Sequence, residues 1–436
     1  MRPLKFTLVA LFLATSAAAF DHRSDVSERI SAITGQRLNP DVTVGRAFSL
    51  PPGITSVSPL TEKDAVAIAL WNSPGLEVIL SELDLARADL AEAGILVNPN
   101  FNLLFGIGVK PWEFLLNMPI QALWQRPRRV AAAKLNLEMI SEGLVQNGLD
   151  LVRDTRIAHG EVVAAQRIAA LDAQAKELLA EIADLTEKQE AAGDISGLQA
   201  RLVRLEAINS ANRAARSAKD LELARESLRV FMGATDQLTD LTVTPERQLD
   251  DVPLELNQLV MEALSSRPDL RAAELGVRAA GERAGWEHSR VFNLVAAQLS
   301  SKEVGTFGLK TGPGLSIEIP IFDRNQGGIS RAEAQLRRAT LQYLELAMQV
   351  KSEVRKSRLN VLQAREQLEL LRAGFLPGLR KTLELVENAY ANGDISYLEL
   401  RAAQRPLLDA LRSEENVLRD HRRAMAELER AIGRKL

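Results

Sequence analysis

The stretch Gly193-Asp194-Ile195-Ser196 recurs 200 residues later as Gly393-Asp394-Ile395-Ser396. The match runs on without a gap to Gly233 in the first copy and Gly433 in the second. Solenoid repeats have periods of roughly 20–50 residues, so a period this long indicates two copies of one large unit rather than a solenoid. The chain is therefore predicted to have two pseudo-equivalent halves.

Long helices are predicted on both sides of each of these turns. The glycine can take the left-handed conformation that ends a helix, and the serine can cap the helix that returns. In the second half Val350, Val354, Ser357 and Val361 alternate steps of four and three, the seam of a coiled coil. About sixty helical residues would span roughly 90 Å, far more than a globular domain needs.

Each half also contains an alternating pattern that predicts one β-hairpin before its long helix. In the first half Phe101, Leu103 and Phe105 alternate with polar or small residues, and in the second half Ile317 and Ile319 do so. Shorter helices precede the hairpins, from 61 to about 97 and from about 255 to 290. The predicted first repeat covers 61–241, with strands at about 100–109 and 113–122, a long helix at about 128–191 and a return helix at 197–233. A linker at 242–254 leads to the second repeat at 255–436, with strands at about 292–302 and 312–323, a long helix at about 328–391 and a return helix at 397–433.

The N-terminus has the features of an export signal. Arg2 and Lys5 precede an apolar run that ends at Leu13, and Ala17-Ala18-Ala19 offers a small-residue cleavage site. Residues 1–19 are therefore predicted to be a signal peptide, followed by an extended segment at 20–60. An uncleaved membrane anchor is the alternative, although the run is shorter than the ~20 residues of a spanning helix.

Composition argues against several classes of protein. The net charge is −3, with 54 basic and 57 acidic residues, so a nucleic-acid partner is not expected. There is no cysteine, and the four histidines (His22, His159, His288 and His421) are scattered, so no metal site is predicted. No phosphate-binding loop or nucleophile elbow is present, and we expect neither a cofactor nor an enzyme.

The four predicted strands cannot cross a membrane alone, because the edges of the sheet would leave unpaired backbone groups in lipid. Bacterial membrane barrels begin at eight strands, and small ones are filled by their own side chains. Three chains would supply twelve strands and an open lumen. The fold class expected is thus mainly α with a small membrane β part: a trimer with a 12-stranded outer-membrane β-barrel on a long periplasmic α-helical barrel.

The chain resembles the TolC-like outer membrane factors, also called outer membrane efflux proteins, over essentially its whole mature length. The resemblance lies in the Ala-Leu-x-x-x-Pro-x-Leu opening of both halves (69–76 and 263–270), in Gly312-Pro313-Gly314-Leu315-Ser316, and in the segment from Tyr390 to Gln404. It implies a homotrimer in the cell outer membrane with a large periplasmic part. It also implies a duct that exports substrates with a periplasmic adaptor (membrane fusion protein) and an inner-membrane pump of the RND type.

Residues 321–327, Ile-Phe-Asp-Arg-Asn-Gln-Gly, are similar to the branch of the family that contains CzcC and serves heavy-metal efflux. The alternative is that this segment is only the corner between strand and helix. The cargo, metal ions or drugs, is left open.

The resemblance implies two functional places. The first is the periplasmic tip, where the duct closes and meets the adaptor: Gly193, Asp194, Ile195, Ser196, Leu198, Gly393, Asp394, Ile395, Ser396 and Leu398. The second is Glu399, a candidate pore gate at which three carboxylates would repel one another and bind cations. Its counterpart in the first half is the neutral Gln199. The alternatives are that the glycines are ordinary helix ends and that Glu399 is a solvated charge paired with an arginine.

A protein of a different class would be a soluble periplasmic coiled-coil protein, such as the adaptor itself. Adaptors have long helical hairpins, but they lack paired β-hairpins inserted into a duplicated helical unit. The duct is therefore the preferred prediction.

Overall fold

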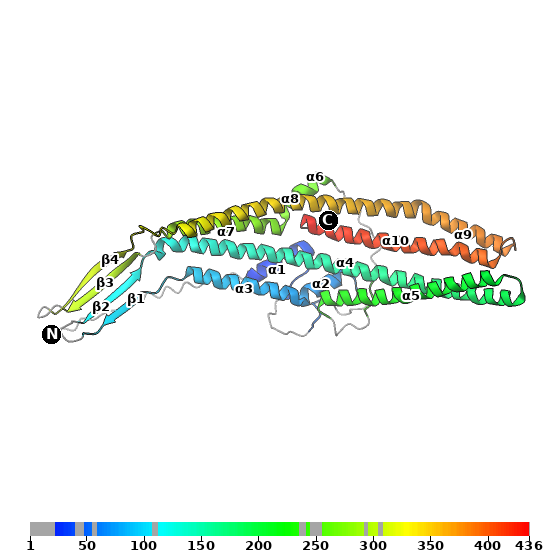
Figure 1. The fold of residues 1–436 in the computed structure, drawn as a ribbon, viewed down its shortest axis with the longest axis horizontal. Helices are drawn as coiled ribbons and strands as arrows, with labels where there is room; N and C mark the ends of the chain where they lie inside the picture. The colour runs from blue at the N-terminus through cyan, green and yellow to red at the C-terminus, as the bar shows by residue number, and fades with distance from the viewer. Residues whose placement is uncertain are drawn as a thin grey trace.

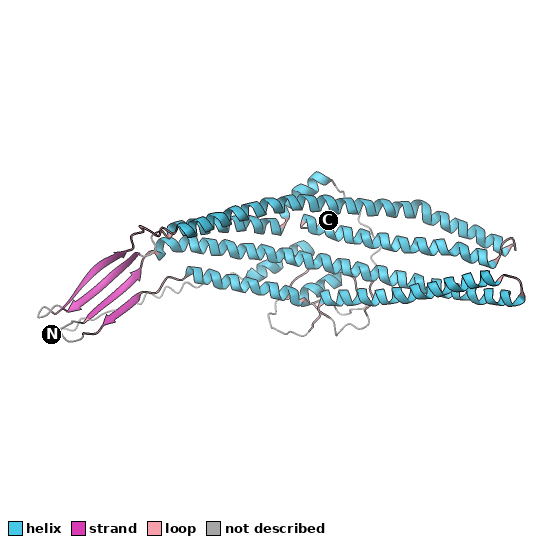
Figure 2. Ribbon diagram, viewed as in Figure 1, coloured by secondary structure: helices cyan, strands magenta, loops and turns pink. Residues whose placement is uncertain are grey.

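The computed structural model describes residues 22–39, 48–54, 59–106, 112–234, 241–244, 255–291, 295–303 and 308–435. The protomer is an elongated body with a small β-sheet at one end and two helix–turn–helix ends at the other (Figures 1 and 2). The predicted signal peptide at 1–19 lies outside the described residues.

The first repeat consists of α2 (Glu62–Asn72), α3 (Pro74–Gly94), β1 (Asn100–Leu104), β2 (Glu113–Pro119), α4 (Ala122–Ala192) and α5 (Gly197–Met232). The second repeat has the same order: α6 (Leu256–Ser266), α7 (Pro268–Ser289), β3 (Val295–Glu303), β4 (Leu309–Ile317), α8 (Gln326–Leu370), α9 (Leu376–Ala391) and α10 (Tyr397–Ile432). A π-helical turn, η2 (Leu371–Phe375), separates α8 from α9.

The strands form one antiparallel sheet in the order β1-β2-β3-β4, so the hairpins of the two repeats are joined through β2 and β3. The expected strand at 312–323 is displaced, because β4 spans 309–317. Pro320 has no N–H to donate to a neighbouring strand, and the backbone bond from Ile321 N to Ile319 O marks a turn there. The other strands also differ from their expected bounds, and parts of them (107–111 and 292–294) lie outside the described residues.

The expected extended segment at 20–60 is wrong in its first part, because α1 (His22–Thr34) is helical. Val26 and Ile30, four residues apart, are fully buried in a cluster with Leu144 and Val145 of α4. Packing on the body of the protein thus stabilises a helix that has little amphipathic signal beyond these two residues.

Each short helix that was expected before a hairpin is broken into two. Pro74 and Pro268 open α3 and α7, and the residue before each proline is extended. This break follows from the clash of a proline ring with a helical residue before it.

The second long helix is not continuous, in contrast to the prediction for 328–391. Thr155, Ala158 and Val162 on α4 have the same spacing and burial as Val354, Ser357 and Val361 on α8, so corresponding positions here lie 199 residues apart. At the turns, Gly193 and its counterpart Gly393 are 200 residues apart. The second repeat therefore has one residue more than the first between this buried seam and the turn. The π-helical turn lies in that interval and accommodates the additional residue.

Candidate functional site

The two turns at the helical end of the body, 193–196 and 393–396, are called the tip turns below. Gly193 and Gly393 have φ values of 84° and 80°, and the N–H of the next aspartate bonds back to a carbonyl of the preceding helix. No atom lies within 4 Å of where a Cβ would be at either glycine. Within one protomer the turn conformation therefore explains these glycines, and a close backbone approach does not.

The same capping box follows each turn. Ser196 donates from its N–H and its hydroxyl to Gln199 Oε1, both at 3.1 Å. Ser396 donates in the same way to Glu399 Oε2, at 2.8 Å and 2.9 Å. The two tip turns thus have the same geometry and differ at this position in charge alone.

Glu399 is exposed, and its carboxylate is engaged by its own helix end. The backbone N–H and the hydroxyl of Ser396 lower the pKa of Glu399 by bonding to its ionised form. Each chain therefore presents one carboxylate that is ionised at neutral pH at this end, where the first repeat presents an amide.

The remaining predicted tip residues lie at the same end of the molecule (Figure 1). Asp194, Asp394 and Leu198 are exposed, whereas Ile195 and Ile395 are half-buried; the side chain of Leu398 lies outside the described residues. A groove between the two hairpins joins Tyr390 of α9 to Ile182, Leu185, Thr186 and Gln189 of α4. No local sequence pattern predicts this groove, because its sides come from separate repeats.

The sheet at the opposite end has one apolar and one polar face. Residues that pair directly across strands share a face, and Leu116 of β2 lies opposite both Phe101 and Leu299. The apolar face carries Phe101, Leu103, Phe114, Leu116, Met118, Val295, Ala297, Leu299, Leu309, Pro313, Leu315 and Ile317, with Ser301 and Thr311 bonded to each other among them. The other face carries Asn100, Asn102, Leu104, Glu113, Leu115, Asn117, Pro119, Ala296, Gln298, Ser300, Lys302, Lys310, Gly312, Gly314 and Ser316.

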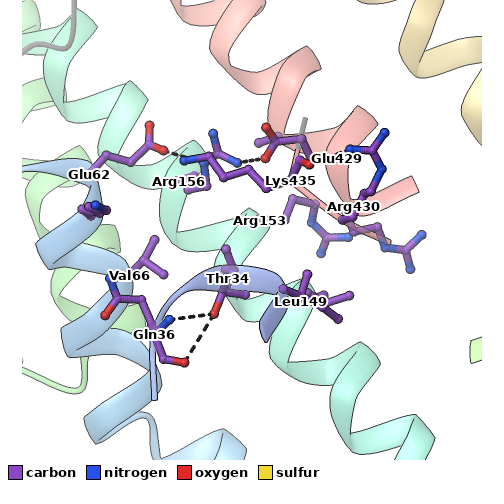
Figure 3. A pocket seen from close by; sticks show the side chains of 15 residues that line it. Thr34, Gln36, Glu62, Val66, Leu149, Arg153, Arg156, Glu429, Arg430 and Lys435 are labelled. Atoms are coloured by element: carbon purple, nitrogen blue, oxygen red, sulfur yellow. Dashed lines mark hydrogen bonds and ion pairs between the residues drawn. The ribbon is translucent and has the colours of Figure 1, made fainter. Parts of the chain in front are cut away.

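A network of ion pairs crosses the middle of the body. Arg156 of α4 bonds to Glu62 of α2 at 2.5 Å and to Glu429 of α10, beside a small cavity where α1, α2, α4 and α10 meet (Figure 3). Arg267, which is 2% exposed, bonds to Asp269 and Glu353. The pair between Arg156 and Glu429 joins the two repeats, and these residues are too far apart in the sequence for the pair to be predicted from it.

No helix in the described part of the chain is both long and apolar enough to cross a membrane. Among those same residues, no cluster of three or more histidine or acidic side chains could hold a metal ion.

Residues 259–434, nearly the whole second repeat, match the family described as "Outer membrane efflux protein". This match covers less than half of the chain. Among its relatives is the "Cobalt-zinc-cadmium resistance protein CzcC" of Cupriavidus metallidurans, which is 24% identical over 385 residues, or 87% of this chain and 91% of the relative. The chain is thus similar to CzcC over both repeats.

Solved structures show the same fold. The structure of CusC has a TM-score of 0.71 at 19% identity, covering 91% of this chain and 98% of that one. The Campylobacter jejuni CmeC outer membrane channel has a TM-score of 0.72 at 15% identity, covering 91% and 94%. The expected fold class is confirmed, with α-helices and a small sheet in the arrangement of the TolC-like channels.

Proposed function

We propose that three copies of this chain form a passive duct through the outer membrane, the exit of a tripartite efflux system. The match of residues 259–434 to the outer membrane efflux protein family favours this function over the soluble adaptor. The duct would catalyse no reaction. A periplasmic adaptor and an inner-membrane pump of the RND type would supply substrate and energy.

The observation that carries the proposal is the division of the sheet into two faces. Its apolar face suits lipid and its polar face suits a water-filled lumen. Among the described strands, β1 and β4 each pair with one neighbour and form the two edges of the sheet. Pairing β4 of one chain with β1 of the next would satisfy both edges. Three chains would give the twelve strands of an open barrel.

The helices also support an assembly in which one side of each chain packs on the opposite side of the next. Gly160 of α4 is buried, and its Cα faces Arg422 of α10 in the same chain. Its counterpart on α8 is Leu359, which is 60% exposed. Likewise Leu149 lines the cavity beside Ala426 on α10, whereas its counterpart Met348 is 65% exposed.

The missing partner of α8 is supplied by α5 of another copy. The return helix α5 is the counterpart of α10, and its Leu223 and Val230 are 67% and 56% exposed. Packing α8 of one chain on α5 of the next would repeat the α4–α10 contact and bury apolar side chains on both sides. Such a heterologous contact closes into a ring when the rotation is right.

The tip turns are proposed as the surface that meets the adaptor, and Glu399 as the gate. Threefold symmetry would bring three ionised Glu399 side chains to one level of the lumen, a site that attracts cations. Because the first repeat has Gln199 there, the ring would hold three charges. This arrangement would bind cations weakly rather than block them strongly.

Divalent metal ions are the proposed cargo class. The support is the name of CzcC, a cobalt-zinc-cadmium resistance protein, and its similarity to this chain over both repeats. Drug export is the alternative, since the chosen cargo depends on the pump.

The test is the state of the mature protein extracted from outer membranes in mild detergent. A heat-modifiable trimer that conducts ions in a planar bilayer is expected. A water-soluble monomer would refute the duct. Deletion of the gene should raise the sensitivity of the host to zinc, cobalt or cadmium. If metal sensitivity is unchanged and drug sensitivity increases, the cargo is drugs and not metal ions.

A further inference from the structure

Three charged residues of the sheet gather in one layer of its polar face. Glu113 of β2 lies directly opposite Lys302 of β3, and Lys302 lies directly opposite Lys310 of β4. The carboxylate of Glu113 pairs with the ammonium group of Lys302 at 2.7 Å. Leu104 of β1, opposite Glu113, completes the layer. These four residues are called the outer layer below, because they lie at the end of the sheet away from the helical body (Figure 1).

The other layers of this polar face contain no charged residue in the described strands. In order toward the helices they are Asn102, Leu115, Ser300 and Gly312; then Asn100, Asn117, Gln298 and Gly314; and then Pro119, Ala296 and Ser316. The charge of the face is therefore confined to one level.

The outer layer also has the longest side chains of the face. The layers below it include two glycines, Gly312 and Gly314, and several alanine and serine residues. Leucine, glutamate and two lysines occupy all four positions of the outer layer. In a barrel whose lumen is lined by this face, the outer layer would reach farthest toward the axis and form the narrowest level.

The two lysines do not help the sheet to form. Like charges that lie directly opposite each other destabilise a pair of strands, and both Lys302 and Lys310 are exposed. Two lysines and one glutamate leave a net charge of +1 per chain in this layer. The segments that continue the strands, 105–112 and 303–309, add Lys110 and Glu303, whose charges cancel. Three chains would therefore place a net charge of about +3 at this level.

Aromatic residues on the opposite face separate this layer from lipid. Phe105 and Trp112 pack edge to face with their ring centroids 5.0 Å apart. They adjoin Leu104 and Glu113 in the sequence, so by alternation they continue the apolar face. Aromatic residues at the end of an apolar band lie at the membrane–water interface of a barrel. Lys302 and Lys310 are on the other face, which suits a lumen and not the headgroups of the lipid.

We propose that Lys302 and Lys310 of three chains form an anion-binding ring at the outer mouth of the duct, with small polyvalent anions as its ligands. This inference rests on the proposed trimeric duct. Rings of lysine or arginine select anions in pores, and a charged constriction concentrates ions of the opposite sign. The ring has the opposite sign to the proposed Glu399 gate and lies at the opposite end of the chain. It lowers the concentration of cations at the mouth and so opposes the return of exported cations.

The test is block of the full-length protein by sulfate in a planar bilayer. Dilute KCl is used, because salt screens exposed charges. Sulfate should lower the single-channel conductance at a lower concentration from one chamber than from the other, since the ring lies at one end of the duct. The quantity compared between variants is the sulfate concentration that halves the conductance from the more sensitive side.

Two variants change the charge of the ring in opposite directions. Lys302→Met with Lys310→Met should raise the half-blocking concentration about 2- to 25-fold, since each exposed pair contributes a factor of about 1.4 to 5. Glu113→Gln removes the only carboxylate of the outer layer and keeps both lysines. It should lower the half-blocking concentration about 1.4- to 5-fold.

Two controls separate the position of the charge from its amount. Lys302→Arg with Lys310→Arg keeps the charge of the ring and should keep the block. Lys63→Met with Lys435→Met removes the same number of charges from exposed positions beside the mid-body cavity (Figure 3). This second control should leave the half-blocking concentration unchanged.

The proposal is overturned if the double Met variant of the ring is blocked as strongly as the unmodified protein, if the mid-body control weakens the block equally, or if Glu113→Gln weakens it. If the double Met variant does not assemble, Glu113→Gln decides alone. An unmodified protein that conducts without sulfate block would overturn the ring and leave the duct standing. An unmodified protein that forms no trimer and does not conduct would refute the duct, and the ring with it.

Discussion

Gln199 and Glu399 make the same pair of hydrogen bonds, each accepting from the backbone N–H and the hydroxyl of the serine three residues before it. The duplication has thus kept the helix cap and changed its charge. The amide of Gln199 accepts both cap hydrogen bonds without a charge. The cap therefore does not require the charge of Glu399, which is available for a separate electrostatic role.

Glu399→Gln should therefore keep the cap and remove the cation preference of the channel. Glu399→Ala should remove both, because it also deletes the acceptor of the two Ser396 hydrogen bonds. The measurement is the reversal potential across a salt gradient. Gln199→Glu is the reciprocal variant, and it should strengthen cation preference; equal selectivity of all four proteins would contradict the gate.

The cation preference should also persist in acid. Ser396 lowers the pKa of Glu399, so the carboxylate keeps its charge as the pH falls through the usual value of 4.5 and loses it only below. Selectivity measured from pH 7 to pH 3 should decline only at the acid end. A decline centred above pH 5 would show that the three carboxylates repel one another strongly instead.

Stability should fall between about pH 6.5 and pH 4 because of His421. Burial, with help from Arg365 and Arg422, lowers the pKa of His421 to about 4. The unfolded chain, with a histidine pKa near 6.5, then binds more protons than the native one, so acid favours unfolding by about 2 kcal/mol per chain.

The variant His421→Leu should flatten this part of the pH profile of the melting temperature. Burial also lowers the pKa of His159, so some slope should remain. His288→Leu is the matched control, since His288 is 56% exposed and lies 3.4 Å from Glu333. A profile that His288→Leu flattens as much as His421→Leu would contradict the assignment.

Two glycines with the same backbone conformation should respond differently to alanine. Gly193→Ala adds only the strain of a left-handed residue, about 1–2 kcal/mol, because its surroundings are open. Gly233→Ala adds the same strain and puts a Cβ 2.6 Å from the carbonyl oxygen of Asn72, which should cost at least 1 kcal/mol more. Thermal unfolding of both variants measures the difference, and equal losses would contradict the packing at Gly233.

Arg156→Met should destabilise the body strongly. It leaves Glu62 and Glu429 without their shared partner, and breaking a partly buried pair of this kind costs about 3–5 kcal/mol. Arg204→Met is the control: it breaks an exposed pair with Glu187 and should cost less than about 1 kcal/mol. If denaturant unfolding shows similar losses of unfolding free energy for both variants, the larger contribution expected of the Arg156 pairs is contradicted.

Local signals in the sequence predicted the tip turns well. Gly193 and Ser196 determine their own conformations, so the turn, its caps and the return helix follow from a few neighbouring residues. The heptad pattern through Val354 and Val361 could also be predicted from the sequence, because its residues repeat along one helix.

Features that depend on distant contacts were missed. The helix α1 forms because Ile30 packs over Gly148 in α4, and no local sequence pattern predicts that contact. The strand β4 ends at Ile317, ahead of Pro320, although the alternating apolar residues continue past it. The ion-pair network and the groove beside Tyr390 join the two repeats, so neither repeat contains them alone.

In the proposed assembly, α8 of one chain packs on α5 of the next in a closed ring of three. Met348 and Glu226 are the counterparts of Leu149 and Ala426, which line one cavity, and the chain has no natural cysteine. Met348→Cys with Glu226→Cys, treated with a short bis-maleimide in outer membranes, should give covalent dimers and trimers, with the trimer as the largest product. Monomers alone, or a ladder that continues beyond the trimer, would contradict the ring.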